Sequence, residues 1–110
     1  EILQLYRSLL DNMRLHNPMC RLLLLEPFLL HTGTVTDEMV ESLRPIQVGI
    51  ASIARDFDVP IIPLQSVFDR ALSRAPAAYW AYDGIHPTHA GFQLIADNWL
   101  QTVETHGLLQ

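Results

Sequence analysis

The sequence contains no lysine, and it has no run of basic residues. Its seven basic side chains are all arginines, which are scattered among twelve acidic residues, and the net charge at pH 7 is −5. A surface that binds nucleic acid or an anionic membrane needs concentrated positive charge. The composition therefore argues against either of these as the main partner.

Cysteine and long apolar runs are also scarce. Cys20 is the only cysteine, so no disulfide bond can form within the chain. The leucine run from Leu22 to Leu25 is far shorter than the roughly 20 residues that span a bilayer, and we expect no membrane span. With 110 residues, 49% of them hydrophobic, the chain falls within the size range of one small globular domain, and no second domain is indicated. None of these features indicates a cellular compartment.

The spacing of apolar residues predicts helices that alternate with short strands. An amphipathic pattern predicts a helix over residues 1–16, which Pro18 ends because it disfavours helical geometry in the residue before it. Two short apolar runs, Cys20 to Leu25 and Val59 to Leu64, are predicted strands. Neither run alternates with polar residues, which is typical of strands buried on both faces in a parallel sheet.

Three further helices are predicted. One starts at Thr36 and carries an apolar stripe to Phe57, with a kink or break expected at Pro45. A short helix is expected over residues 67–73, and Thr88 can cap a final helix that ends near residue 105. The residues expected on the buried side of the final helix are Phe92, Ile95, Trp99 and Val103.

This order of elements implies an α/β fold with parallel strands and right-handed crossovers. Two strands are too few for a stable parallel sheet, and an open sheet edge of this kind favours aggregation. We therefore expect further strands to come from a segment upstream of residue 1.

The segment Asp83-Gly84-Ile85-His86-Pro87-Thr88 carries the most informative chemistry, and it lies in a loop predicted over residues 75–87. An aspartate three residues before a histidine on a tight loop can accept a hydrogen bond from the imidazole Nδ1–H. The other ring nitrogen, Nε2, is then free to take a proton from a hydroxyl nucleophile. By spacing alone, the pattern favours a capping aspartate and a surface histidine before a helix.

The block Tyr79 to Gly91 closely resembles the last conserved block of the SGNH (GDSL-type) hydrolases, in which Asp-Gly-x-His-Pro is followed by a glycine a few positions later. The resemblance implies that the chain is the C-terminal portion of a flavodoxin-like three-layer α/β/α sandwich, incomplete in this chain. It also implies that His86 acts as general base and then general acid, and that Asp83 orients it.

The family's nucleophilic serine lies in an early Gly-Asp-Ser block, and its oxyanion-hole glycine and asparagine lie in two middle blocks. None of the five serines of this chain follows Gly-Asp. The resemblance therefore implies that the upstream half of the same domain supplies the nucleophile.

Other candidate site residues have competing interpretations. Asp83, His86 and His89 have a spacing that a metal site could use. No further ligands cluster near them, so we expect no bound metal. Glu26 follows the first strand, at the edge where open α/β sheets bind ligands, and it could line a cleft or simply face solvent. Three aromatic residues could form a substrate wall or belong to the core: Phe28, Tyr79 and Trp80.

The sequence thus predicts a serine ester hydrolase that acts on a small ester through an acyl-enzyme, without a metal or organic cofactor. The alternative is a non-catalytic α/β module, for binding or assembly, with a degenerate site.

Overall fold

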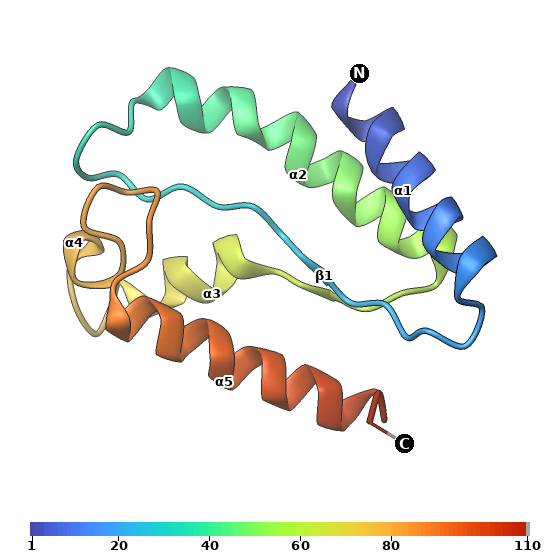
Figure 1. The fold of residues 1–110 in the computed structure, drawn as a ribbon. Coiled ribbons are helices and arrows are strands. Elements are labelled where there is room, and N and C mark those ends of the chain that lie inside the picture. The colour runs from blue at the N-terminus through green and yellow to red at the C-terminus, as the bar shows by residue number, and fades with distance from the viewer. Residues whose placement is uncertain (110) are drawn as a thin grey trace.

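The computed structural model describes residues 1–109, and Figure 1 shows its helices on both sides of the extended segment that contains β1. The elements in chain order are α1 (Ile2–His16), β1 (Leu24–Leu25), α2 (Asp37–Phe57), β2 (Ile61–Ile62), α3 (Leu64–Ala71), α4 (Ala77–Trp80) and α5 (His89–Thr105). None of the helices in residues 1–109 combines the length and the apolar character that crossing a bilayer requires.

The two strands are parallel, and the long helix α2 connects them. Leu24 pairs with Ile61 and Leu25 with Ile62. The ladder is much shorter than the predicted strands of residues 20–25 and 59–64. The carbonyl oxygen of Pro60 accepts from Leu24, but Pro60 has no N–H with which the ladder could continue before β2. After Ile62 the chain soon enters α3, which begins at Leu64.

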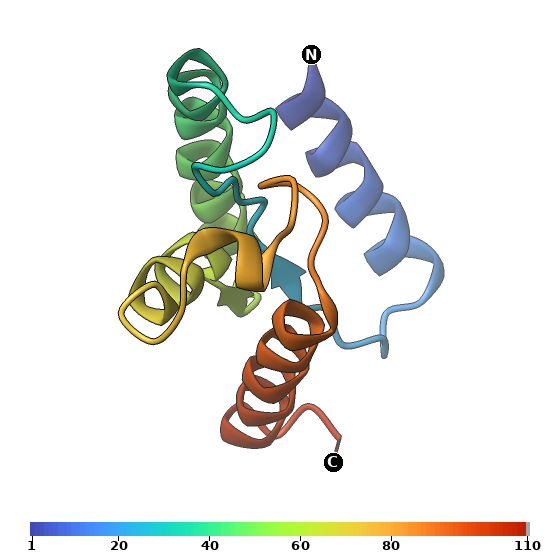
Figure 2. The ribbon, with the colours of Figure 1, turned by 90° about the vertical axis from the view of Figure 1, so that its left-hand side faces the viewer.

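Both faces of this pair are covered, which gives three layers. On one face, Leu24 and Ile61 pack against α1 and α2, in a cluster that includes Ile50 and Ile53. On the other face, Ile62 packs in a second cluster whose partly buried members include Leu94 and Ile95 of α5. Figure 2 shows α1 and α2 on one side of the strands and α5 on the other. The predicted α/β/α class with parallel strands is confirmed.

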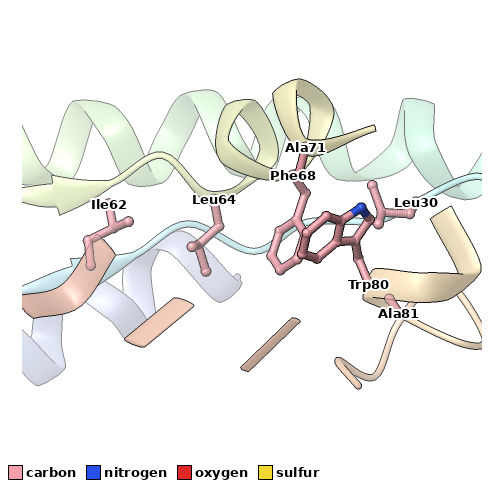
Figure 3. Packing of buried hydrophobic residues seen from close by; sticks show 7 residues of the cluster. All are labelled: Leu30, Ile62, Leu64, Phe68, Ala71, Trp80 and Ala81. Atoms are coloured by element: carbon pink, nitrogen blue, oxygen red, sulfur yellow. The ribbon is translucent and has the colours of Figure 1, made fainter. Parts of the chain in front are cut away.

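The second cluster is built around Phe68 of α3 and Trp80 of α4 (Figure 3). Both side chains are buried, and the ring of Phe28 stacks on that of Phe68 with 4.2 Å between the ring centroids. This cluster anchors α4, and with it the start of the loop that contains Asp83 and His86.

Some helix predictions are correct and others are wrong. Thr36 and Thr88 cap α2 and α5 as predicted, since each hydroxyl oxygen accepts a hydrogen bond from a main-chain N–H three residues later. The expected break at Pro45 does not occur, and α2 runs through it. On the C-terminal side of the proline, Ile46, Ile50 and Ile53 pack in the first cluster, and this packing offsets the loss of one helical hydrogen bond.

The remaining corrections concern boundaries and exposure. Helix α3 begins at Leu64, three residues before the predicted start, and residues 75–87 contain the short helix α4 instead of a continuous loop. Phe92 and Trp99 are 59% and 39% exposed, although the sequence predicted them on the buried side of α5. Which face of α5 is buried depends on the elements that pack against it. The spacing of apolar residues within α5 does not specify those elements.

Candidate active site

The loop from Ala81 to Pro87 is closed at its base. Ala81 and Pro87 form an isolated antiparallel bridge, and the main-chain N–H of Thr88 donates to the carbonyl oxygen of Trp80 at 2.9 Å. The Thr88 hydroxyl donates to the carbonyl oxygen of Tyr79 at 2.6 Å. The hydroxyl oxygen of Thr88 also accepts a hydrogen bond from the main-chain N–H of Gly91 at 3.1 Å. The Thr88 side chain therefore connects the loop to both flanking helices, α4 and α5.

Gly84 lies at the tip of this loop with a φ of +84°. A Cβ on this residue would collide with the carbonyl oxygen of Leu30 and lie 2.5 Å from Val35 Cγ2. The loop therefore packs directly on the segment that follows β1. This is the carboxyl edge of the strands, the edge at which open α/β sheets bind their ligands.

Asp83 and His86 form a hydrogen-bonded pair within the loop. Oδ2 of Asp83 lies 2.6 Å from Nδ1 of His86. Oδ1 accepts two further hydrogen bonds, from the main-chain N–H groups of Ile85 at 2.9 Å and His86 at 2.7 Å. The carboxylate thus fixes both the loop backbone and the orientation of the imidazole.

These hydrogen bonds hold the pKa of the Asp83 carboxyl far below its ordinary value. The largest cause is the main-chain N–H of His86, followed by the imidazole of the same residue. Partial burial acts in the opposite direction but is outweighed. Because hydrogen bonds to a charged form favour that form, Asp83 stays ionised at neutral and mildly acidic pH.

The imidazole of His86 is accessible. Its side chain is 67% exposed, against 24% for that of Asp83. With Nδ1–H donating to Asp83, Nε2 carries a lone pair, and within residues 1–109 no hydrogen bond occupies it. The ring of Tyr82, which the sequence did not single out as a site residue, lies nearly parallel to that of His86 with 6.2 Å between the centroids.

Of the other predicted site residues, Glu26 and Phe28 both make contacts that hold the fold. Oε1 of Glu26 accepts a hydrogen bond from the main-chain N–H of Gln65 at 2.9 Å, which satisfies a free donor at the start of α3. Phe28 stacks on Phe68. Both residues also line an apolar groove that reaches Ile85, next to His86.

Trp80 and Tyr79 differ in exposure. Trp80 is 4% exposed and its indole N–H donates to the carbonyl oxygen of Ala75, so it belongs to the core and not to an open substrate wall. Tyr79 packs edge-on against Trp80 and remains 54% exposed. Within residues 1–109, no three histidine, cysteine, aspartate or glutamate side chains come together as a metal-binding group.

Two glutamines that the sequence gave no reason to select fix the loop after β1. Gln65 bonds to both main-chain groups of Leu29, and Gln47 bonds to the carbonyl oxygen of Pro27. A single glutamine in a helix belongs to no motif. The one available signal was the position of Gln65, two residues after Pro63, the proline that follows β2.

No model of a protein family matches the chain, and no curated protein matches it. Solved structures do match. One, described as a GDSL-like lipase from Parabacteroides merdae, is 32% identical, with a TM-score of 0.84 over 94% of this chain and 47% of its own. An α/β hydrolase from the metagenome of Lake Arreo in Spain is 26% identical, with a TM-score of 0.73 over 98% of this chain and 49% of its own.

An acetylxylan esterase from Geobacillus stearothermophilus has a similar fold, with a TM-score of 0.77 at 22% identity over 92% of this chain and 45% of its own. The layered fold and these likenesses define the class of the chain as that of hydrolases with an α/β fold. Within that class, these likenesses are consistent with the SGNH (GDSL-type) hydrolases. The chain spans about half the length of the structures it matches.

Proposed function

We propose that this chain supplies the histidine and aspartate of a serine ester hydrolase, with His86 as the proton-transfer group and Asp83 as its orienting partner. The observation that carries the proposal is the 2.6 Å contact between Asp83 Oδ2 and His86 Nδ1, which leaves Nε2 unoccupied on an exposed ring. A neutral imidazole held in this tautomer is the base that a serine hydroxyl needs.

The proposed reaction has two steps. Nε2 of His86 takes the proton of a serine hydroxyl while the serine oxygen bonds to the ester carbonyl carbon. The tetrahedral intermediate then collapses, and the alcohol leaves with the proton from Nε2. Water repeats the sequence on the acyl-enzyme and releases the acid. The ionised Asp83 stabilises the imidazolium that forms in each step.

The spacing of the pair supports this assignment. In the acetylxylan esterase from Geobacillus stearothermophilus, structures described as catalytic mutants replace an aspartate and, three positions later, a histidine. Asp83 and His86 have the same separation. The likeness to that enzyme concerns the fold, so the support comes from the matching spacing alone.

The serine and the oxyanion donors would come from the upstream half of the same domain. The chain leaves apolar surface for such a partner to cover, since Ile2, Leu5 and Leu9 of α1 are 55%, 69% and 57% exposed. The groove between Leu25 and Ile85 is apolar as well, and it continues to the loop that carries His86. A partner seated there would bring its nucleophile to Nε2.

We propose small acyl esters, including O-acetyl groups on carbohydrate or short-chain lipid esters, as the substrate class. The relatives whose printed descriptions name an activity are lipases and esterases. Chemistry of this kind uses neither a metal nor an organic cofactor.

The proposal is tested in what we call the assembled hydrolase. This is residues 1–110 joined to the segment of the Parabacteroides merdae protein that has no counterpart in this chain. A fluorophosphonate, which reacts covalently with an activated serine, should label the assembled hydrolase at a serine of the added segment. Residues 1–110 alone should be neither labelled nor active.

Two outcomes would contradict the proposal. If the assembled hydrolase folds but is neither labelled nor active, the chain is a non-catalytic module in which Asp83 serves only to cap the loop. If a chelator abolishes an activity that fluorophosphonate leaves intact, the reaction instead depends on a metal.

A further inference from the structure

Gln65 lies in the first turn of α3, and its side-chain amide makes the two hydrogen bonds to a main-chain residue that the backbone of a neighbouring strand would make. Its Oε1 accepts a hydrogen bond from the main-chain N–H of Leu29 at 3.0 Å, and its amide nitrogen donates to the carbonyl oxygen of Leu29 at 3.0 Å. The parallel ladder ends near Glu26, whose N–H donates to Ile62. Gln65 therefore continues the pairing of the chain beyond the end of the sheet.

The orientation of this amide is fully determined. Oε1 also accepts from the side-chain amide of Gln47 at 3.1 Å, and the nitrogen also donates to Oδ1 of Asp69 at 3.0 Å. A glutamine side chain offers two donor and two acceptor positions, and all four are used here. Gln47 additionally donates to the carbonyl oxygen of Pro27 at 2.9 Å. The loop after β1 is thus held at two points by one connected group of side chains.

The loop after β1 packs directly against the loop that carries Asp83 and His86. Leu30, the residue after the one that Gln65 holds, donates its main-chain N–H to the carbonyl oxygen of Gly84 at 3.0 Å. A Cβ placed on Gly33 would lie 2.5 Å from Cα of Asp83. The backbones are in direct contact, so a shift of the loop after β1 moves the carboxylate.

We propose that Gln65 is a positioning residue for the Asp83–His86 pair, and that it acts through Leu29, Leu30 and Gly84. The inference rests on the proposed function and extends it to a residue that touches neither substrate nor reacting atoms. Loss of the Gln65 amide frees the loop after β1, and displacement of a reacting group by about 1 Å can cost about 10²-fold in rate.

The test compares Gln65→Leu with Gln93→Leu in the assembled hydrolase. Gln93 is a matched control, because its amide donates to Asp97 one turn along an exposed face of α5 at 2.8 Å, as that of Gln65 does to Asp69. Active sites are counted by fluorophosphonate labelling, and kcat per labelled site and KM are measured with 4-nitrophenyl acetate. Amide exchange at Leu30 and the Nδ1 proton of His86 are followed by NMR.

For Gln65→Leu we expect kcat per labelled site to fall by about 10- to 100-fold with KM little changed. Leu30 should exchange faster and the Nδ1 proton of His86 should become less protected, whereas Gln93→Leu should change none of these. A fall in the number of labelled sites with normal kcat per site would show a structural role only and overturn the proposal. So would unchanged exchange at Leu30.

Gln47→Leu keeps the inference testable if Gln65→Leu does not fold. It removes the bonds to Gln65 and to Pro27 but leaves the two bonds between Gln65 and Leu29, so a smaller fall in kcat per site is expected. An unchanged kcat would overturn the proposal. If the unsubstituted protein is not labelled, the proposed function fails. The exchange data on Leu30 still decide whether Gln65 holds the loop.

Discussion

The main-chain N–H of Leu30 donates a 3.0 Å hydrogen bond to the carbonyl oxygen of Gly84. This bond joins the loop after β1 to the loop that carries Asp83 and His86, two segments more than fifty positions apart in the sequence. It places the pair at the carboxyl edge of the strands, and it requires that Gly84 has no side chain.

Gly84→Ala should therefore destabilise the protein and lower its activity. The residue has a φ of +84°, and a methyl group would meet the carbonyl oxygen of Leu30, which is backbone and cannot turn away. Strain of this kind costs about 1–3 kcal/mol per residue. Urea unfolding measures the loss. In the control Gly49→Ala, the added methyl meets only the flexible side chain of Leu3, so a smaller effect is expected. Equal effects would contradict this account of the loop.

Asp83→Asn tests the orienting role without removing the loop contacts. The asparagine oxygen can still accept from the main-chain N–H groups of Ile85 and His86, but its NH₂ group cannot accept from Nδ1–H. The imidazole then favours the wrong tautomer, a change that costs about 10⁴ in the serine protease triad. We expect kcat of the assembled hydrolase to fall by at least about 10²-fold. Asp97→Asn, on the exposed face of α5, should have no such effect.

The hydrogen bonds to Asp83 also predict its behaviour on acidification. Its folded pKa lies below its unfolded value, which is about 3.9. Its contribution to stability is therefore complete above that value and is lost only as the pH falls through the lower, folded pKa. The ¹³C resonance of the Asp83 carboxyl should stay unchanged from about pH 7 to about pH 4 and shift only below that. A peptide of residues 81–88 should titrate near 3.9, the ordinary aspartate value, and the same midpoint in the folded protein would refute the prediction.

Thr88 should affect both stability and rate, whereas Thr36 should affect stability alone. Each hydroxyl caps a helix, and removing such a cap costs about 1 kcal/mol. Thr88 additionally donates to the carbonyl oxygen of Tyr79 at the base of the loop that carries Asp83 and His86. Thr88→Val and Thr36→Val should therefore lower the unfolding free energy by similar amounts, and only Thr88→Val should lower kcat. Equal kcat values for the two variants would mean that the Thr88 hydroxyl does not position the loop.

Much of the fold followed from local patterns. The caps at Thr36 and Thr88 were predictable because a helix start needs a side-chain acceptor for its free N–H groups. The two buried runs indicated parallel strands because both of their faces are apolar. Strand length was wrong, because it depends on the partner strand, and Pro60 has no N–H with which the pairing could continue before β2.

The site was predictable only where it is local in sequence. Asp83 and His86 are three residues apart, so a turn brings them together, and their hydrogen bond could be foreseen. The sequence left open whether Trp80 forms a substrate wall or belongs to the core, because burial depends on what the fold places around α4, and the structure leaves it 4% exposed. Gln65 acts on Leu29, 36 positions earlier in the chain, and no pattern of spacing indicates such a contact.

The most direct measurement of the central claim is the activity of His86→Ala beside that of His89→Ala in the assembled hydrolase. His89 begins α5 three residues later and is exposed, so it controls for the loss of a nearby imidazole. If His86 transfers the proton, His86→Ala should lower kcat/KM by about 10²–10⁴-fold and slow fluorophosphonate labelling. His89→Ala should leave both near normal. Normal turnover by a folded His86→Ala variant would contradict the account.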